Sequence, residues 1–203
     1  MKLYHCAKTR SVRVLWLLDE LGLEYDLDVL PFNAEALKAP DFLEISPLGK
    51  VPLLVDDAVT MVESVAIIQY LLNRYGNGRL EPDRAGPDYG TFLQWLHFGE
   101  ATMMGPISQV FQHTRFLPED KRDPEVADQG RRTFAAYAQV LDRVLAEHDY
   151  LVGDEFSAAD IVVGYTLFLA DLAKMLPASS KHLKAYYERL RQRPSFQMAT
   201  TTG

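Results

Sequence analysis

A glutamate and a serine, Glu63 and Ser64, stand where a predicted helix begins directly after a predicted strand. The first N–H groups of a helix have no partner within the helix, and the helix dipole adds a partial positive charge, so this position suits a carboxylate. The Ser64 hydroxyl can add one hydrogen bond, and the Glu63 carboxylate can receive an ammonium group. A plain helix start is the alternative interpretation, and an isolated Glu-Ser pair does not decide between the two.

Two hydroxyl side chains, Thr9 and Ser11, lie between the first predicted strand and the first predicted helix. A free thiol has a pKa near 8.5, and one or two donors at a helix N-terminus lower such a value by roughly two units. These hydroxyls are therefore candidate donors to a bound anion such as a thiolate, with Lys8 and Arg10 as electrostatic helpers. For Ser11, simple capping of the helix is the alternative.

Cysteine and histidine offer little further chemistry. The single cysteine, Cys6, cannot form an intrachain disulfide, which favours a reducing, cytoplasmic setting. The histidines have no metal-ligand spacing, so we predict no metal site. They are His5, His97, His113, His148 and His182.

The composition excludes several functional classes. The chain has 203 residues and a formal net charge of −7, with no excess of Lys and Arg, so we expect no nucleic-acid partner. We also expect no signal peptide and no membrane span, because no apolar run reaches the length that either segment needs.

The first 75 or so residues alternate short apolar runs with helical patterns, in the order βαβαββα. The first crossover predicts a parallel strand pair, and the last two strands predict an antiparallel hairpin, giving a mixed four-stranded sheet. The expected strands are 2–5, 25–30, 51–55 and 58–61. The expected helices are 11–21 and 63–75, with a looser helix or loop at 34–44. A stretch rich in Gly and Pro, 76–87, marks the domain boundary.

The second half shows only helical periodicity and predicts an all-α helical bundle over residues 88–203, after a first domain of residues 1–77. The expected helices are 88–114, a segment around 134–145, 158–176 and 180–191. Ser157 and Asp160 are spaced as a capping box at the start of the third of these helices. We expect residues 198–203 to form a loose tail.

Several motifs together resemble the cytosolic glutathione S-transferase superfamily, especially its theta- and beta-like bacterial and fungal members. Residues 45–52, Ile-Ser-Pro-Leu-Gly-Lys-Val-Pro, resemble the family's Asn-Pro-x-Gly-x-Val-Pro loop. Residues 63–64 resemble its Glu/Gln-Ser pair, and residues 157–161 its buried capping motif. Residues 9–16 resemble the Ser-Arg-Ser run before Arg-Val-Leu-Trp. The resemblance implies a thioredoxin-like domain that binds glutathione and a helical domain that receives an electrophile.

The resemblance also implies roles for the loop and the pair. It predicts a cis peptide bond at Val51-Pro52, which would direct the Val51 backbone groups toward the cysteinyl part of the tripeptide. Glu63 and Ser64 would hold the γ-glutamyl group. Lys50 would lie close to the glycyl carboxylate, and Arg10 is counted with this binding set.

Aligning residues 13–14 with the Arg-Val of the family's motif indicates which residue would donate to the thiolate. Thr9 falls where theta-like members have a catalytic serine and beta-type members a catalytic cysteine, and it is the first candidate; Ser11 is the second. The zeta, tau and phi groups place their serine at or beside Lys8 by the same alignment, so a shift by one residue stays open. Cys6 lies three residues too early to be the catalytic cysteine of a beta-type member. The electrophile pocket is expected near four side chains of the second domain: Phe98, Met103, Met104 and Tyr165.

The implied function is a detoxifying glutathione transferase that attacks hydrophobic electrophiles, with glutathione peroxidase activity as a side reaction. The family also implies a homodimer. Two alternatives stay open: a glutathione-dependent disulfide reductase or isomerase on the same fold, and a non-catalytic protein-interaction module. No unambiguous catalytic serine, tyrosine or cysteine is present to separate them.

Overall fold

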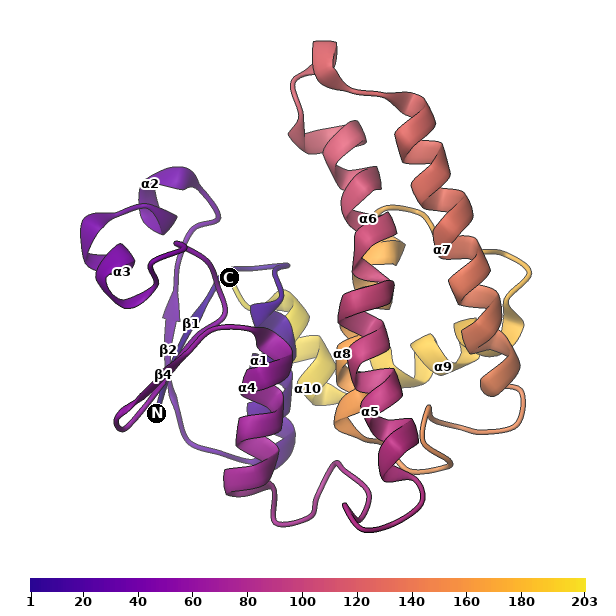
Figure 1. Ribbon diagram of the computed structural model, residues 1–203, viewed down its shortest axis with the longest axis horizontal. Helices are drawn as coiled ribbons and strands as arrows, with labels where there is room; N and C mark the ends of the chain where they lie inside the picture. Colours follow the sequence, from indigo (N-terminus) through magenta and orange to yellow (C-terminus); the bar gives the residue numbers. More distant parts are fainter. The chain divides into compact units, whose positions relative to one another are not determined.

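The computed structural model describes all residues, 1–203, and the chain divides into two compact units (Figure 1). The first unit comprises residues 1–81 together with residues 191–203, and the second comprises residues 82–190. The C-terminal segment therefore clusters with the first unit, although the sequence pattern grouped it with the helical half.

A four-stranded mixed sheet forms the centre of the first unit, as predicted. Its strands are β1 (Lys2–His5), β2 (Asp26–Val29), β3 (Leu53–Asp56) and β4 (Val59–Met61), in the order β2-β1-β3-β4. Strand β1 pairs with β2 in parallel, whereas the β1–β3 and β3–β4 pairs are antiparallel. The apolar side chains of Leu3, Leu53 and Leu54 are fully buried.

Three helices of the first unit lie along one face of the sheet: α1 (Ser11–Leu21), α4 (Ser64–Leu71) and α10 (Pro194–Thr201) (Figure 1). A π-helical turn, Leu72–Gly76, extends α4. Two short helices, α2 (Ala34–Leu37) and α3 (Pro40–Ile45), occupy the segment for which the sequence predicts a loose helix or loop. Helix α1 contacts both α4 and α10, and residues Val14–Leu18 have no exposed surface.

Helix α10 continues to Thr201, Ala199 is fully buried and the Thr202 carbonyl contacts His5, so the expectation of a loose tail over residues 198–203 is wrong. The segment before it is also anchored. Arg193 donates to both carboxylate oxygens of Glu20, at 2.7 and 2.8 Å, and the Ser195 hydroxyl also donates to Glu20. The ring of Phe196 packs edge-on against Trp16, with centroids 5.0 Å apart. Burial raises the pKa of the Glu20 carboxyl, but these donors outweigh it and hold the pKa below its usual value.

The second unit consists of helices, as predicted. They are α5 (Tyr89–His97), α6 (Met104–Phe111), α7 (Pro124–Val144), α8 (Ala158–Leu172) and α9 (Lys181–Arg191). Short π or 3₁₀ turns lie at Phe98–Thr102, Gln112–Phe116 and Glu119–Lys121. Helix α8 packs closely on the chain at Gly99, where an added Cβ would lie 2.9 Å from Val162 Cγ1. No helix combines the length and the hydrophobicity that crossing a bilayer requires.

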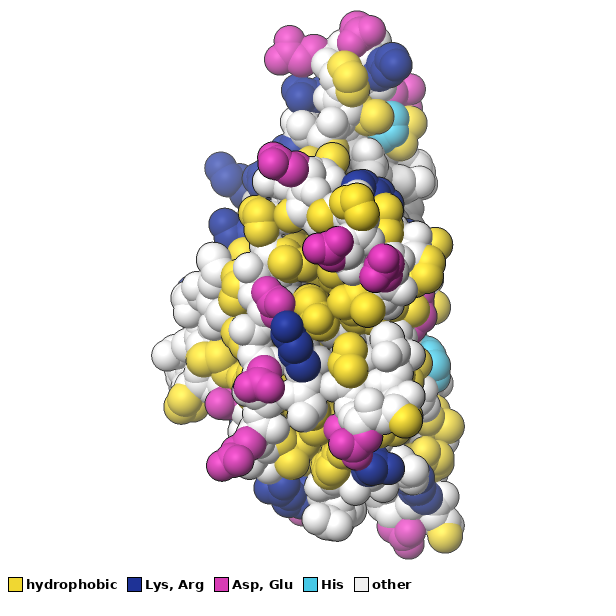
Figure 2. Space-filling view, turned by 90° about the vertical axis from the view of Figure 1, so that its left-hand side faces the viewer, with side chains coloured by type: hydrophobic (Ala, Val, Ile, Leu, Met, Phe, Trp, Pro, Cys, Tyr) yellow, Lys and Arg dark blue, Asp and Glu magenta, His cyan; other side chains and the backbone are white.

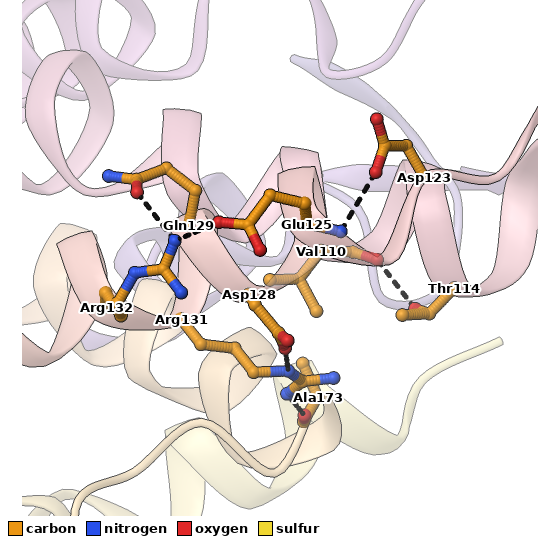
Figure 3. Close-up of polar contacts among 9 residues, drawn as sticks. All are labelled: Val110, Thr114, Asp123, Glu125, Asp128, Gln129, Arg131, Arg132 and Ala173. Carbon is orange, nitrogen blue, oxygen red and sulfur yellow. Dashed lines mark hydrogen bonds and ion pairs between the residues drawn. The ribbon is translucent and has the colours of Figure 1, made fainter.

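Polar contacts fix the start of α7 (Figure 3). Asp123 caps the helix by accepting from the Glu125 N–H at 2.9 Å, and Arg132 donates to Glu125 and Gln129. Arg131 donates to the Ala173 carbonyl at 3.2 Å and so connects α7 to the end of α8.

The predicted capping box at the start of α8 is confirmed. The Asp160 side chain accepts from the Ser157 N–H at 2.8 Å, and the Ser157 side chain accepts from the Asp160 N–H. The carboxylate also accepts from the Ser157 hydroxyl, the Leu151 N–H and the Tyr186 hydroxyl, at 2.9, 3.0 and 2.9 Å. Burial raises the pKa of the fully buried Asp160 carboxyl, and these donors oppose the shift.

Candidate active site

Three chain segments converge at the carboxyl end of β1. Strand β1 leads into the loop before α1, and Tyr4 of β1 pairs with Leu53, the first residue of β3, which follows Val51-Pro52 directly. Because β4 runs antiparallel to β3 and Met61 pairs with Leu54, the chain returns to the same edge before α4 begins. The topology therefore gathers Thr9, the Val51-Pro52 loop and Ser64 at one end of the sheet.

Thr9 and Ser11 occupy different environments in the first of these segments. Thr9 is half-buried, and its hydroxyl lies 2.8 Å from both the Cys6 carbonyl and Ser11 Oγ. Ser11 is fully buried, and its Oγ contacts His5 Nδ1 at 2.8 Å and accepts from the Cys6 N–H at 3.2 Å. Only Thr9 therefore keeps a hydroxyl near the surface.

The structure does not bear out the capping interpretation of Ser11. Ser11 is the first residue of α1, and its hydroxyl faces β1 and the segment after it. The N–H group of Ser11 donates to Thr9 Oγ1 at 3.4 Å. Lys8 adopts a left-handed backbone with φ of 60° and is exposed, while Arg10 is half-buried at the N-cap position.

Cys6 has no exposed surface, and burial raises the pKa of its thiol to about 11. A thiol with that pKa is almost entirely protonated at neutral pH, and the thiolate is the reactive form. The structure therefore gives Cys6 no role as a nucleophile.

The loop before β3 is held by Ser46, a residue that sequence reasoning did not single out. The Lys50 N–H donates to Ser46 Oγ at 3.2 Å, and the Ser46 hydroxyl donates to the Lys50 carbonyl at 3.0 Å. Gly49 has φ of 57° and lies so close to Leu37 that an added Cβ would meet its carbonyl oxygen at 2.2 Å. The Lys50 side chain is exposed.

The Val51-Pro52 peptide bond is cis, as predicted. Val51 precedes the ladder of β3, which begins at Leu53, and its N–H and C=O make no backbone hydrogen bond in the loop. Both groups therefore remain available to pair with an extended ligand.

Ser64 begins α4, and Glu63 precedes it with φ of 73° and ψ of 104°. A non-glycine residue held in such a sparsely populated region costs on the order of 1–3 kcal/mol and is often found at a functional site. Arg13 of α1, fully buried, donates from Nη1 to Ser64 Oγ at 3.1 Å. The sequence analysis used Arg13 only within the motif of the first helix. Its position inside an apolar run was the signal that could have indicated a buried arginine with a specific partner.

The four side chains expected near the electrophile lie in the second unit, and three of them are buried there. Met103, Met104 and Tyr165 have exposed fractions of 0%, 4% and 1%. Phe98 is half-buried, with its ring against Trp95 and Tyr137.

The structure contains no cluster of three or more His, Cys, Asp or Glu side chains that could hold a metal ion. On the face of the molecule drawn in Figure 2, acidic and basic side chains are interspersed among exposed hydrophobic ones. That face therefore carries no continuous basic patch.

Both halves of the sequence match known domain families. Residues 1–73 match the N-terminal domain of glutathione S-transferase, and residues 103–194 match its C-terminal domain. Glutathione S-transferase 3 of Zea mays is 31% identical, over 97% of this chain and 91% of the maize protein. Glutathione S-transferase GstB of Escherichia coli K12 is 30% identical, over 92% of this chain and 90% of the bacterial protein.

A solved structure of a similar protein contains the ligand that the sequence motifs predict. The theta class glutathione S-transferase from Xanthomonas axonopodis pv. citri, crystallised with glutathione bound, superposes with a TM-score of 0.84 at 28% identity. The match covers 100% of this chain and 97% of that chain.

Proposed function

Since this chain belongs to the glutathione S-transferase family and is a glutathione transferase, we propose that Thr9 is the residue that stabilises the glutathione thiolate. The observation that carries the proposal is the half-exposed Thr9 hydroxyl at the N-terminus of α1, beside a buried Ser11 and a buried Cys6. A donor to the anion lowers the pKa of the thiol, because it stabilises only the ionised form.

The remainder of the tripeptide has a partner for each of its polar groups. The N-terminus of α4 and the Ser64 hydroxyl, itself held by Arg13, suit the γ-glutamyl carboxylate. The exposed Glu63 carboxylate suits the ammonium group. The free Val51 backbone groups suit the cysteinyl amide, and Lys50 and Arg10 offer positive charge to the glycyl carboxylate.

Thiolate attack on a hydrophobic electrophile is the reaction for this site, and the same thiolate can reduce a hydroperoxide as a side activity. We place Phe98 in the electrophile pocket, because its ring is the least buried of the four candidates. The proposed working form is a cytoplasmic homodimer. A disulfide reductase that uses its own cysteine is disfavoured, because Cys6 is buried with a raised thiol pKa.

The test of the tripeptide site is a calorimetric titration of the protein and of Ser64→Ala with glutathione. We expect saturable binding that weakens at least tenfold in Ser64→Ala, about the value of one lost charge-assisted hydrogen bond. Ser108→Ala, on α6 in the second unit, is the matched control and should bind normally. Equal binding by Ser64→Ala and the unmodified protein would contradict the proposed site.

A further inference from the structure

A line of hydrogen bonds runs inward from Thr9 to the C-terminus of the chain. Thr9 Oγ1 lies 2.8 Å from Ser11 Oγ, Ser11 Oγ lies 2.8 Å from His5 Nδ1, and His5 Nε2 lies 3.1 Å from the Thr202 carbonyl oxygen. Gly203 continues past this point, and a Cβ added to it would lie 3.2 Å from side-chain atoms of Ala7 and Val29. Ser11 and His5 in the middle of this line are fully buried, whereas Thr9 at one end and Thr202 at the other are half-buried.

The Thr202 carbonyl determines the direction of these hydrogen bonds. A carbonyl oxygen only accepts, so His5 Nε2 carries a hydrogen and donates to it. In the neutral imidazole Nδ1 is then an acceptor, and the Ser11 hydroxyl donates to it. When Ser11 gives its one hydrogen to His5, Thr9 is the donor between the two hydroxyls. The Cys6 carbonyl also accepts from the Thr9 hydroxyl at 2.8 Å and from the Ser11 hydroxyl at 3.2 Å, so the Thr9 hydrogen alternates between Cys6 and Ser11. In the second of these arrangements, each hydroxyl hydrogen points toward His5.

We propose that His5 accepts the proton of bound glutathione through Thr9 and Ser11, an inference that rests on the proposed role of Thr9. The S–H bond breaks as its proton joins Thr9 Oγ1, Thr9 passes its own proton to Ser11 Oγ, and Ser11 passes its proton to His5 Nδ1. The products are a thiolate and an imidazolium, so the step conserves charge. The hydrogen bonds between sulfur and Thr9, Thr9 and Ser11, and Ser11 and His5 are now reversed, so the Thr9 hydroxyl donates to the sulfur. His5 Nε2 still donates to the Thr202 carbonyl.

The surroundings of His5 suit this role. Burial lowers the pKa of its imidazole, so the ring is neutral at neutral pH and its Nδ1 is an acceptor. The same burial makes the ring a weaker base, so protonation of His5 requires the negative charge of the thiolate formed in the same step. The groups that face it are Ser11 of α1, the Thr202 carbonyl after α10, and Val29 across the β1–β2 pair. The Cys6 thiol beside it stays protonated because its pKa is about 11. Tyr4 precedes His5 in β1, and Gly203 follows the Thr202 carbonyl that His5 contacts. The thiolate formed in the same step supplies a negative charge that stabilises the imidazolium.

His5 does not touch the tripeptide and acts only through the two hydroxyls, so its test must separate proton transfer from structural support. Two readouts do this: the pKa of bound glutathione, from the ultraviolet absorbance of its thiolate, and the protons released on binding, from calorimetry in buffers of different ionisation enthalpy. The variants are His5→Gln, whose amide can donate and accept hydrogen bonds but cannot take up a proton at neutral pH, and Ser11→Ala, which interrupts the line and leaves His5 intact. His182→Gln, on the exposed surface of α9, is the control.

In the unmodified protein and in His182→Gln we expect thiolate to form at neutral pH with little proton release to the buffer. In His5→Gln and Ser11→Ala the thiolate fraction should fall about tenfold, a shift of one pKa unit. Release of one proton for each thiolate formed in the unmodified protein would overturn the proposal. So would an unchanged thiol pKa in Ser11→Ala.

Thr9→Val distinguishes this failure from failure of the proposed function. A raised thiol pKa in Thr9→Val, with unchanged values in His5→Gln and Ser11→Ala, would remove the proton acceptor and keep Thr9 as the donor. An unchanged thiol pKa in Thr9→Val would overturn both.

Discussion

Two polar clusters at helix starts, one before α8 and one before α1, differ in whether their hydrogen bonds terminate on a buried group or reach the surface. At the start of α8, each donor around Asp160 terminates on the same fully buried carboxylate. At the start of α1, hydrogen bonds from the Thr202 carbonyl through His5 and Ser11 end on the half-exposed Thr9. The first cluster has no route to a ligand and serves folding. The second leaves one hydroxyl for chemistry.

The largest expected effect comes from disrupting the cluster around Asp160, called the closed cluster here because all of its donors share one buried carboxylate. Asp160→Ala leaves the Ser157 N–H, the Leu151 N–H and the Tyr186 hydroxyl buried without an acceptor, so we expect the free energy of unfolding to fall by roughly 3 kcal/mol or more. Urea denaturation measures this change. Tyr186→Phe removes one donor and leaves the others paired, and should cost about 1 kcal/mol. Equal losses in the two variants would show that the carboxylate does not organise the cluster.

The matching change at Thr9 should lower activity strongly and the free energy of unfolding by only about 1 kcal/mol, because the half-buried hydroxyl also contacts the Cys6 carbonyl and Ser11. Thr9→Val removes the hydroxyl at constant shape, and we expect kcat/KM for conjugation to fall about 100-fold, the usual effect of losing one donor to a developing anion. Thr9→Ser restores the hydroxyl and should recover most of the rate. A Thr9→Val protein with normal kcat/KM would show that another group stabilises the thiolate.

The hydrogen bonds from Arg193 and Ser195 to Glu20, which anchor α10, predict a stability that depends on pH. The folded protein depresses the pKa of Glu20, so this carboxylate contributes stability above its unfolded pKa of about 4.3, and the contribution is lost as the pH falls through the lower folded value. Glu20→Gln should therefore be less stable than the unmodified protein by about 1–2 kcal/mol at neutral pH. The difference should shrink below about pH 4. Denaturation curves across this range test the sign, and a difference that grows in acid would contradict it.

The smallest effect is expected for the cap itself. Ser157→Ala removes one hydroxyl from the closed cluster, and the loss of such a cap costs about 0.5–2 kcal/mol. Thermal denaturation measures the change. Glutathione binding, which belongs to the first unit, should be unaffected, and weakened binding would show that the cap also supports the active site.

Local motifs account for what could be predicted from the sequence. The capping box spans four residues, the hairpin before α4 joins adjacent strands, and the cis Val51-Pro52 bond lies inside a short loop motif. Each feature depends on residues that are close in the chain, so its signal survives in a single sequence.

The features that could not be predicted from the sequence depend on contacts between residues that are far apart in the chain. Arg13 and Ser64 are 51 positions apart, and His5 and Thr202 are 197 positions apart. The anchoring of α10 by Glu20 likewise joins residues more than 170 positions apart. No spacing or periodicity records such a contact, which is why the C-terminal segment was expected to be loose and Arg13 was not recognised as the partner of Ser64.

The most direct test of the account is the pKa of the glutathione thiol in the complex, titrated by thiolate absorbance in the unmodified protein, Thr9→Val and Thr9→Ser. We predict a value roughly two units below that of the free thiol in the unmodified protein, a similar value in Thr9→Ser and a nearly normal one in Thr9→Val. A depressed value that persists in Thr9→Val would contradict the assignment of Thr9 as the thiolate donor.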